Sequence, residues 1–140
     1  MNSPPLVSIL ITTYNRSNLL PRALNHVLCQ GFRDFEVVVI DDCSTDDTPE
    51  VMKRFDDPRI RYFRNEENVG GTLGDRAHIQ RFINELARGS YFVYVCDDDF
   101  WLSPDLLGRQ VKAHQEYPGT VMVVGGQLSF FLFGDDQIPD

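Results

Sequence analysis

Three groups of polar residues in this sequence have the chemistry of a site for a metal and a phosphate. They are, in chain order, the run Thr12 to Asn15, the pair Asp41 and Asp42, and the run Asp97 to Asp99. Adjacent carboxylates repel one another, and an oxygen-rich cluster is a natural ligand set for Mg²⁺ or Mn²⁺. Such an ion bridges carboxylate and diphosphate oxygens. The residues therefore predict a divalent-metal site that holds an anionic nucleotide.

Each polar group follows a short apolar run, which is typical of a strand buried in a parallel sheet. We expect strands at residues 6–12, 35–40, 60–63 and 91–96, and a further strand that begins at Val121. Apolar residues at helical spacing, and prolines at first helical positions, predict the helices between them. We expect the first helix to be capped by Ser17 and ended by Gly31, and the others from 48 onward, at 72–87 and at 103–117.

Strands that alternate with helices predict an α/β fold, with a mostly parallel sheet, helices on both faces and right-handed crossovers. A chain of 140 residues fits one domain, so we treat 1–140 as a single nucleotide-binding domain. Ligands of such sheets bind outside the carboxyl ends of the strands. We therefore expect the three polar groups to converge on one crevice.

The overall composition excludes several classes of function. With 21 acidic and 13 basic residues the net charge is −8, which argues against a nucleic-acid partner. Three cysteines without a C-x-x-C pair indicate a reducing compartment and argue against disulfides or zinc. No signal-peptide pattern occurs, and no apolar segment reaches the ~20 residues of a membrane-spanning helix. We therefore expect a cytoplasmic protein.

Each candidate binding residue has a functional and a structural interpretation. Asp41 and Asp42 can each form a local turn, although Asp42 can instead accept a hydrogen bond from a base N–H. Tyr14 can stack on the base or pack at the rim. Arg76, just inside a helix, can meet a diphosphate or stay solvated. The acidic run can hold a metal or form a solvated turn or helix cap. We favour the metal because the run directly follows a buried strand.

Other residues give weaker signals. We expect Trp101 and Cys96 to be packed structurally, and we assign no role to His26, His78 or His114, which have no acid or thiol partner at catalytic spacing. The Asn-Val-Gly-Gly loop at 68–71 allows a close backbone approach to a phosphate, or simply a turn.

Three segments resemble, in this order, the motifs of family 2 glycosyltransferases. They are VSILITTYNR at 7–16, VVVIDDCSTDDT at 37–48 and YFVYVCDDDFW at 91–101, and they look most similar to bacterial polysaccharide-synthesis members such as the spore-coat type. The resemblance implies the Rossmann-like, nucleotide-sugar-binding half of a GT-A fold. It further implies transfer of a sugar from a UDP-sugar donor to a glycan or other acceptor hydroxyl, with inversion and with Mn²⁺ or Mg²⁺, in the cytoplasm or at the inner face of a membrane.

The resemblance also implies roles for individual residues. Thr12 and Tyr14 would contact the nucleotide, and Asp42 would bind the base. Asp97 would face the ribose or the sugar, and Asp98, within an element of the DXD type, would be the best metal ligand.

Two features depart from the family pattern. Cys96 stands where many relatives carry an aspartate. In the family, the acceptor-binding half and its catalytic base lie beyond a segment like 121–133, so we expect this chain to lack them and assign no catalytic base. The apolar segment 128–133 would then lack neighbours, which predicts self-association.

Three other classes of protein share parts of the pattern. A dinucleotide-dependent dehydrogenase needs G-x-G-x-x-G after the first strand, where this chain has Thr-Tyr-Asn-Arg-Ser, and is excluded. A phosphoacceptor receiver domain needs a lysine after its last strand, but Lys53 and Lys112 fall in expected helices. A module that binds a nucleoside diphosphate without turnover stays open as an alternative.

Overall fold

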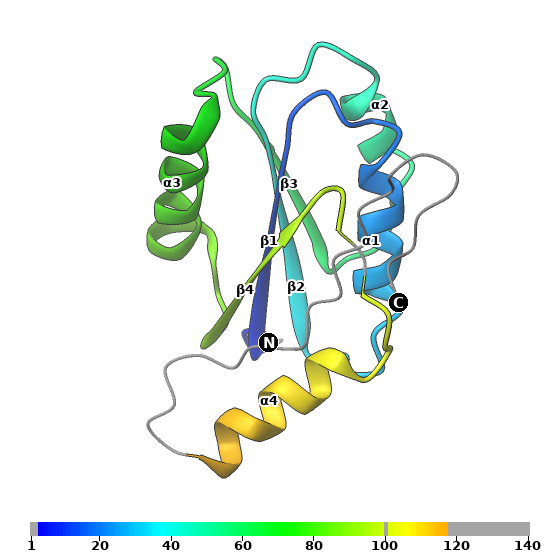
Figure 1. Ribbon diagram of the computed structural model, residues 1–140, viewed down its shortest axis with the longest axis vertical. Coiled ribbons are helices and arrows are strands. Elements are labelled where there is room, and N and C mark those ends of the chain that lie inside the picture. Colours follow the sequence, from blue (N-terminus) through cyan, green and yellow to red (C-terminus); the bar gives the residue numbers. More distant parts are fainter. Residues whose placement is uncertain (1–2, 100, 118–140) are drawn as a thin grey trace, which may run out of the picture.

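The chain forms a four-stranded parallel sheet, seen in a computed structural model that describes residues 3–99 and 101–117, with the backbone alone at 71–75. The strands are β1 (Val7–Thr13), β2 (Phe35–Asp41), β3 (Ile60–Arg64) and β4 (Tyr91–Cys96). Their order is β3-β2-β1-β4, and every pairing is parallel (Figure 1). The four strands predicted here are confirmed to within one residue. The expected strand from Val121 and the segment 128–133 lie outside the described residues.

Four α-helices connect the described strands or follow them. They are α1 (Leu20–Leu28), α2 (Thr48–Met52), α3 (Gly71–Arg81) and α4 (Leu106–Glu116). The helix expected at 72–87 is split, because a π-helical turn at Phe82–Leu86 follows α3. In that turn the Ala87 N–H donates to the carbonyl of Phe82, five residues earlier, at 2.8 Å.

The predicted beginnings of two helices were wrong. Ser17 does not cap α1, which begins three residues later after Leu19. Its N–H instead ties this loop to the Asp46 carboxylate at 3.0 Å, and the N–H groups of Leu19 and Leu20 close a turn onto the Arg16 carbonyl. The chain before α4 forms a turn at Pro104 and Asp105 in place of helix, and the Pro104 carbonyl accepts the Gly31 N–H at 2.8 Å. Contacts between distant segments thus override the local start signals.

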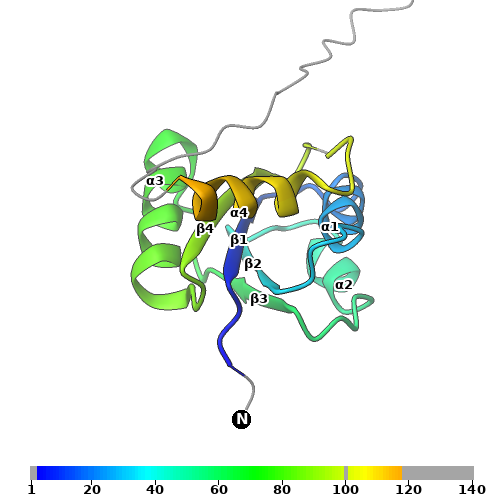
Figure 2. The same ribbon diagram turned by 90° about the horizontal axis from the view of Figure 1, so that it is seen from below.

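Helices cover both faces of the sheet, as predicted. α1 and α2 lie on one face and α3 on the other, while α4 crosses below the sheet from the side of α1 toward that of α3 (Figures 1 and 2). The apolar residues accordingly form two clusters. One joins Ile9 and Ile11 to α1 and to Leu107 of α4, and the other joins Leu10 to Phe82 beyond α3. Strand residues alternate between the two clusters because successive side chains point to opposite faces.

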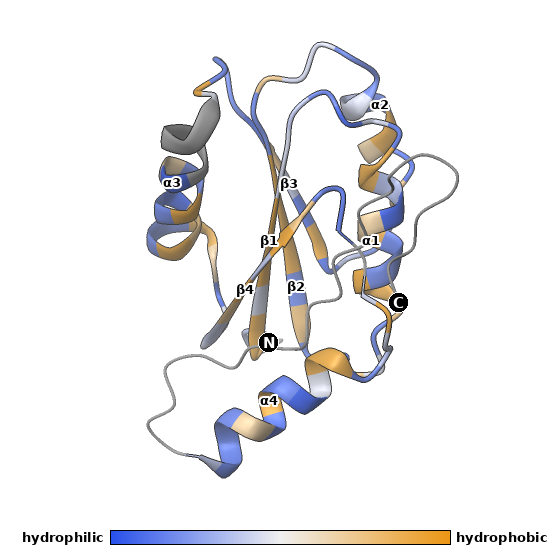
Figure 3. Ribbon diagram, in the orientation of Figure 1, coloured by the Kyte–Doolittle hydropathy of each residue, from blue (hydrophilic) through white to orange (hydrophobic). Residues whose placement is uncertain are grey.

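The central strands carry the most apolar sequence, whereas the loops after them are mostly polar (Figure 3). β1 and β2 are almost fully buried, which explains their near-continuous hydrophobic pattern. Trp101 packs, partly buried, against the larger cluster, which confirms its predicted structural role. Within the described ranges, no helix is long and apolar enough to cross a membrane.

Candidate functional site

The carboxyl ends of β1, β2 and β4 meet at one edge of the sheet. The register pairs Thr13 with Asp41 and Thr12 with Cys96, so the three polar groups arrive at the same level. They open onto a cleft of about 480 Å³. Its walls are formed by Thr12, Thr13, Tyr14, Arg16, Asp42, Asn68, Gly70, His78, Tyr94, Cys96, Asp97 and Asp98.

Most of the binding residues expected from the sequence lie in this cleft. Thr12, Tyr14, Asp42, Asp97 and Asp98 all line it. Arg76 does not line the cleft, and its side chain is exposed on α3. The convergence expected from strand order is therefore present for the three motif segments, but not for the arginine.

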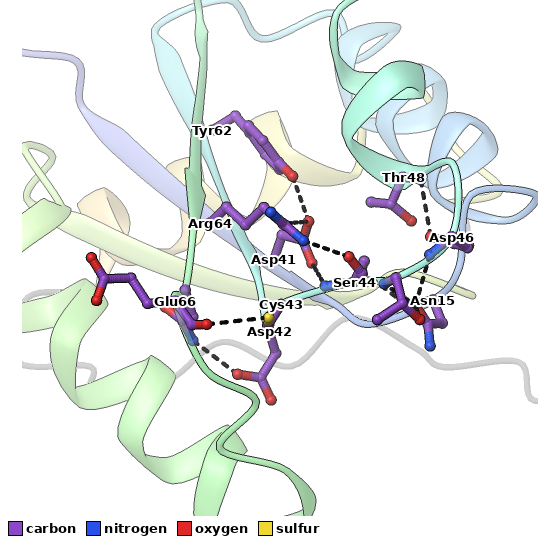
Figure 4. Close-up of polar contacts among 12 residues, drawn as sticks. Asn15, Asp41, Asp42, Cys43, Ser44, Asp46, Thr48, Tyr62, Arg64 and Glu66 are labelled. Carbon is purple, nitrogen blue, oxygen red and sulfur yellow. Dashed lines mark hydrogen bonds and ion pairs between the residues drawn. The ribbon is translucent and has the colours of Figure 1, made fainter.

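The neighbouring carboxylates Asp41 and Asp42 point in opposite directions and do different work (Figure 4). Asp41 is fully buried and accepts hydrogen bonds from the Ser44 N–H at 2.8 Å and from the Tyr62 hydroxyl, with Arg64 Nε 3.6 Å away. Its partners come from the protein itself, so it supports the loop after β2. The local-turn interpretation holds for Asp41.

Asp42 reaches the other way and holds the loop before α3. Its carboxylate accepts the N–H groups of Val69 at 3.0 Å and Gly70 at 2.9 Å, and the side-chain amide of Asn65 at 2.9 Å. Burial alone would raise the pKa of Asp42, but these hydrogen bonds hold it below its usual value. Asp42 is therefore an ionised group that lines the cleft and also shapes the loop opposite.

His78 is a residue that sequence reasoning missed. It is 5% exposed and lines the cleft, with Nε2 3.2 Å from Asp42 Oδ1 and 2.9 Å from Asn65 Nδ2. The expectation that it has no acid partner was wrong. Its partner is distant in sequence, and only the packing of α3 beside the end of β2 joins them.

The acidic run after β4 begins with a carboxyl group tied to β1. The Thr13 hydroxyl donates to Asp97 Oδ2 at 2.8 Å. Burial raises the pKa of the Asp97 carboxyl, while the Thr13 hydroxyl and the nearby Arg16 guanidinium partly offset this. Asp98, next along the chain, is exposed in the cleft wall. The acidic run therefore contributes one partly buried and one open carboxyl group to the cleft, beside the buried Asp42.

Cys96 precedes the acidic run as a neutral thiol. Burial, together with the charge of Asp99, raises the pKa of its thiol to about 11. Because a cysteine binds metal as a thiolate, Cys96 is not suited to that role at neutral pH.

The residues present fit a divalent ion that arrives with its ligand. The part of the chain that the structure describes contains no group of three or more His, Cys, Asp or Glu residues able to hold a metal alone. Mg²⁺, however, is commonly bound by one or two carboxylates plus substrate phosphates and water. Asp98, with Asp97 beside it, offers that set of hard oxygen donors at the cleft.

Arg16 and Tyr94 were also missed, whereas Thr13 belongs to the polar run expected at the site but was given no role of its own. Arg16 directly follows that run, so treating the whole segment 12–16 as one loop would have found it. Tyr94 pairs with Thr12 through a hydrogen bond of 2.9 Å between their hydroxyl oxygens. The alternation of β4 would have placed Tyr94 on the same face as Cys96.

Comparison with known proteins identifies related chains. The model of the family described as "Glycosyl transferase family 2" matches residues 8–132. The GalNAc(5)-diNAcBac-PP-undecaprenol beta-1,3-glucosyltransferase of Campylobacter jejuni is 35% identical over 115 residues, which cover 81% of this chain and 36% of that protein. This chain thus spans about a third of the length of that relative.

Solved structures share the fold. The S. aureus TarS fragment 1-349 in complex with UDP-GlcNAc has a TM-score of 0.68 and 27% identity, covering 79% of this chain and 31% of that chain. The mannosyltransferase PcManGT from Pyrobaculum calidifontis, in complex with GDP-Man and Mn2+, has a TM-score of 0.66 and 26% identity, covering 81% and 33% respectively.

Proposed function

Because the chain belongs to glycosyl transferase family 2, we propose that it is the donor-binding part of an enzyme that transfers a sugar from a nucleoside-diphosphate sugar to an acceptor hydroxyl. The observation that carries the proposal is the convergence of three strand ends on one cleft lined by Tyr14, Asp42, Asp97 and Asp98. Family membership also sets aside the alternative of a phosphoacceptor receiver domain.

The cleft offers a group for each part of the donor. Tyr14, whose side chain is 45% exposed, is free to stack on the base, and Thr12 lies beside it in the same wall. Asp42 contributes to base recognition with its ionised carboxylate and through the loop it holds. Asp97 faces the ribose or the sugar. Arg76 is a candidate contact for the diphosphate, because it is exposed in the helix that follows Gly70 of the cleft wall.

We propose Asp98 as the main residue that holds Mn²⁺ or Mg²⁺. Its exposed carboxylate lies in a cleft whose other acidic groups are already hydrogen-bonded to the protein. When bound, a divalent ion supplies Lewis-acid stabilisation of the departing diphosphate. The complex of PcManGT with GDP-Man and Mn2+ supports such an arrangement in a structural neighbour.

The donor base is proposed to be uracil, because a TarS structure contains UDP-GlcNAc. The acceptor is proposed to be a growing glycan, and the reaction to invert the anomeric carbon. The name of the Campylobacter relative includes a PP-undecaprenol-linked acceptor. This supports the proposal that the enzyme acts in the cytoplasm or at the inner face of a membrane.

Calorimetric titration of UDP into the chain tests this proposal. We expect binding with Mn²⁺, loss of most affinity with EDTA or in Asp98→Ala, and weaker competition by GDP and ADP. Asp99→Ala is the matched control, because Asp99 is a neighbouring exposed acid that does not line the cleft. Equal losses in both variants, or no binding of any nucleotide, would contradict the proposal.

A module that binds the donor without transferring the sugar is the second candidate for these 140 residues. The observation that favours it is that the chain spans only 36% of its Campylobacter relative. Hydrolysis or transfer of labelled UDP-sugar by the chain itself would decide for the enzyme. UDP binding without turnover, over a panel of UDP-sugars and glycan acceptors, would decide for the binding module.

A further inference from the structure

Asn15 ties the loop after β1 to the loop after β2. Its backbone N–H donates to Ser44 Oγ at 2.9 Å, and its side-chain Oδ1 accepts the N–H groups of Thr45 at 2.7 Å and Asp46 at 3.2 Å. The Thr45 hydroxyl is a further donor at 3.3 Å. One exposed side chain therefore serves as acceptor for three donors of the neighbouring loop.

The backbone of Asn15 restricts which residue can do this. Its φ angle is +52°, in the left-handed region that glycine and asparagine adopt most readily. Glycine would allow the backbone but would remove the acceptor oxygen. Alanine would remove the oxygen and also disfavour the backbone. Asparagine meets both requirements.

The loop that receives Asn15 is anchored to the sheet (Figure 4). Ser44 is 1% exposed, its N–H is bonded to the buried Asp41, and its carbonyl accepts Arg64 Nη2 at 2.7 Å. A second hydrogen bond joins the two loops, because the Asp46 carboxylate accepts the Ser17 N–H at 3.0 Å. The segment from Asn15 to Ser17 is therefore fastened to a rigid support.

This segment and the residue directly before it supply two residues of the cleft wall. Tyr14 and Arg16 flank Asn15, and both line the cleft. Nearly half of the Tyr14 side chain is exposed, so packing does little to fix it. Its place depends on the backbone that Asn15 holds.

We infer that Asn15 is a positioning residue for nucleotide binding, because it fastens the segment that carries Tyr14 and Arg16 to the loop after β2. This inference rests on the proposed binding of a nucleoside diphosphate. Asn15 acts through its neighbours and does not itself touch the ligand.

Three substitutions separate the side chain of Asn15 from its backbone. Asn15→Gly allows the left-handed backbone but removes the acceptor oxygen. Asn15→Ala removes the acceptor oxygen and also disfavours that backbone, whereas Asn15→Asp keeps an acceptor oxygen. Asn18→Ala is the matched control, since this asparagine of the same loop is exposed and its side chain makes no hydrogen bond among the described residues. UDP affinity with Mn²⁺ is measured by calorimetry, and circular dichroism verifies that each protein is folded at the temperature used.

We expect Asn15→Gly and Asn15→Ala to weaken UDP binding roughly tenfold, the scale of one or two lost hydrogen bonds. Asn15→Asp should stay within about threefold of the unmodified chain, and Asn18→Ala should be unchanged. Because the comparison is made on folded protein, a residue that only stabilises the fold would leave these affinities alone. A folded Asn15→Gly that binds UDP as tightly as the unmodified chain, or an Asn15→Asp that loses as much, would overturn the inference.

Ser44→Ala tests the same tie from the other side if an Asn15 variant does not fold. It removes the acceptor of the Asn15 N–H and should weaken UDP binding about threefold, whereas an unchanged affinity would count against the inference. Failure of the unmodified chain to bind UDP would instead remove the proposed function, and this inference with it.

Discussion

Replacing Asp42 by asparagine, which exchanges one carboxylate oxygen for an NH₂ group, should destabilise the protein strongly. The carboxylate accepts hydrogen bonds of 2.9–3.1 Å from three donors, which are the N–H groups of Val69 and Gly70 and the Asn65 amide. An asparagine has one acceptor oxygen, so its NH₂ group must face at least one of these donors. One charge-assisted bond is then lost and the others lose their ionic character.

The loss can be estimated from these contacts. A hydrogen bond to a charged group contributes about 1.5–3 kcal/mol, so one lost bond and two weakened ones should cost about 2–4 kcal/mol. Total stabilities are only about 5–15 kcal/mol, which makes the change easy to detect. Equilibrium unfolding in urea, followed by circular dichroism, should show a lower midpoint with little change in slope. Asp47→Asn, at an exposed neighbouring aspartate, should change stability by less than about 0.5 kcal/mol.

The effect should also depend on pH in a definite direction. The folded protein holds the pKa of Asp42 below its usual value, so this carboxylate stabilises the fold above the pKa of an unfolded aspartate. The contribution is lost as the pH falls through the lowered folded pKa. The difference between the unmodified chain and Asp42→Asn should therefore shrink in acid. A loss below about 1 kcal/mol at pH 7, or a difference that grows in acid, would refute the reasoning.

Three further outcomes are expected. Partial burial would raise the pKa of Asp46, but hydrogen bonds from Thr48 and Ser17 lower it to about 2, so Asp46→Asn should cost roughly 1–2 kcal/mol at pH 7 in urea unfolding. That difference should vanish between about pH 4 and pH 2. Thr13→Val removes the hydroxyl that offsets the raised pKa of Asp97, so UDP binding with Mn²⁺ should require a higher pH than before, whereas an unshifted pH profile would contradict this role. Glu36→Ala breaks the buried ion pair with Arg61 (3.0 Å) and should lower the free energy of unfolding in urea by about 2–4 kcal/mol. A change near zero would show that the pair is dispensable.

Much of the fold was predictable because its signals are local. A strand buried on both faces reads as a continuous β-branched run, as in Val37 to Ile40, and a helix on a sheet repeats apolar residues every three or four positions. Helix starts were less predictable. Ser17 has the residue type of a cap, but a turn closed onto the Arg16 carbonyl, in a loop tied to Asp46, moves the start of α1 to Leu20.

The candidate site was predictable as a place, but not as a set of contacts. Strand order brings Thr12, Asp42 and Asp98 to one edge because all carboxyl ends of a parallel sheet lie together. The sequence pattern does not reveal that Arg16 rather than Arg76 lines the cleft. That choice depends on how each loop leaves its strand.

By itself, the sequence determined the element order, the parallel sheet and the edge where the motifs meet, since hydrophobic periodicity and chain connectivity leave few alternatives. Only the tertiary structure decided how Asp41 and Asp42 divide their work, and that His78 lies beside Asp42. These two aspartates are adjacent and chemically identical, and alternation indicates only that they face opposite sides. Asp41, the last residue of β2, turns toward Tyr62, and Asp42, just past the strand, turns toward the loop before α3. Each carboxylate therefore meets different partners, which come from parts of the chain that only packing brings together.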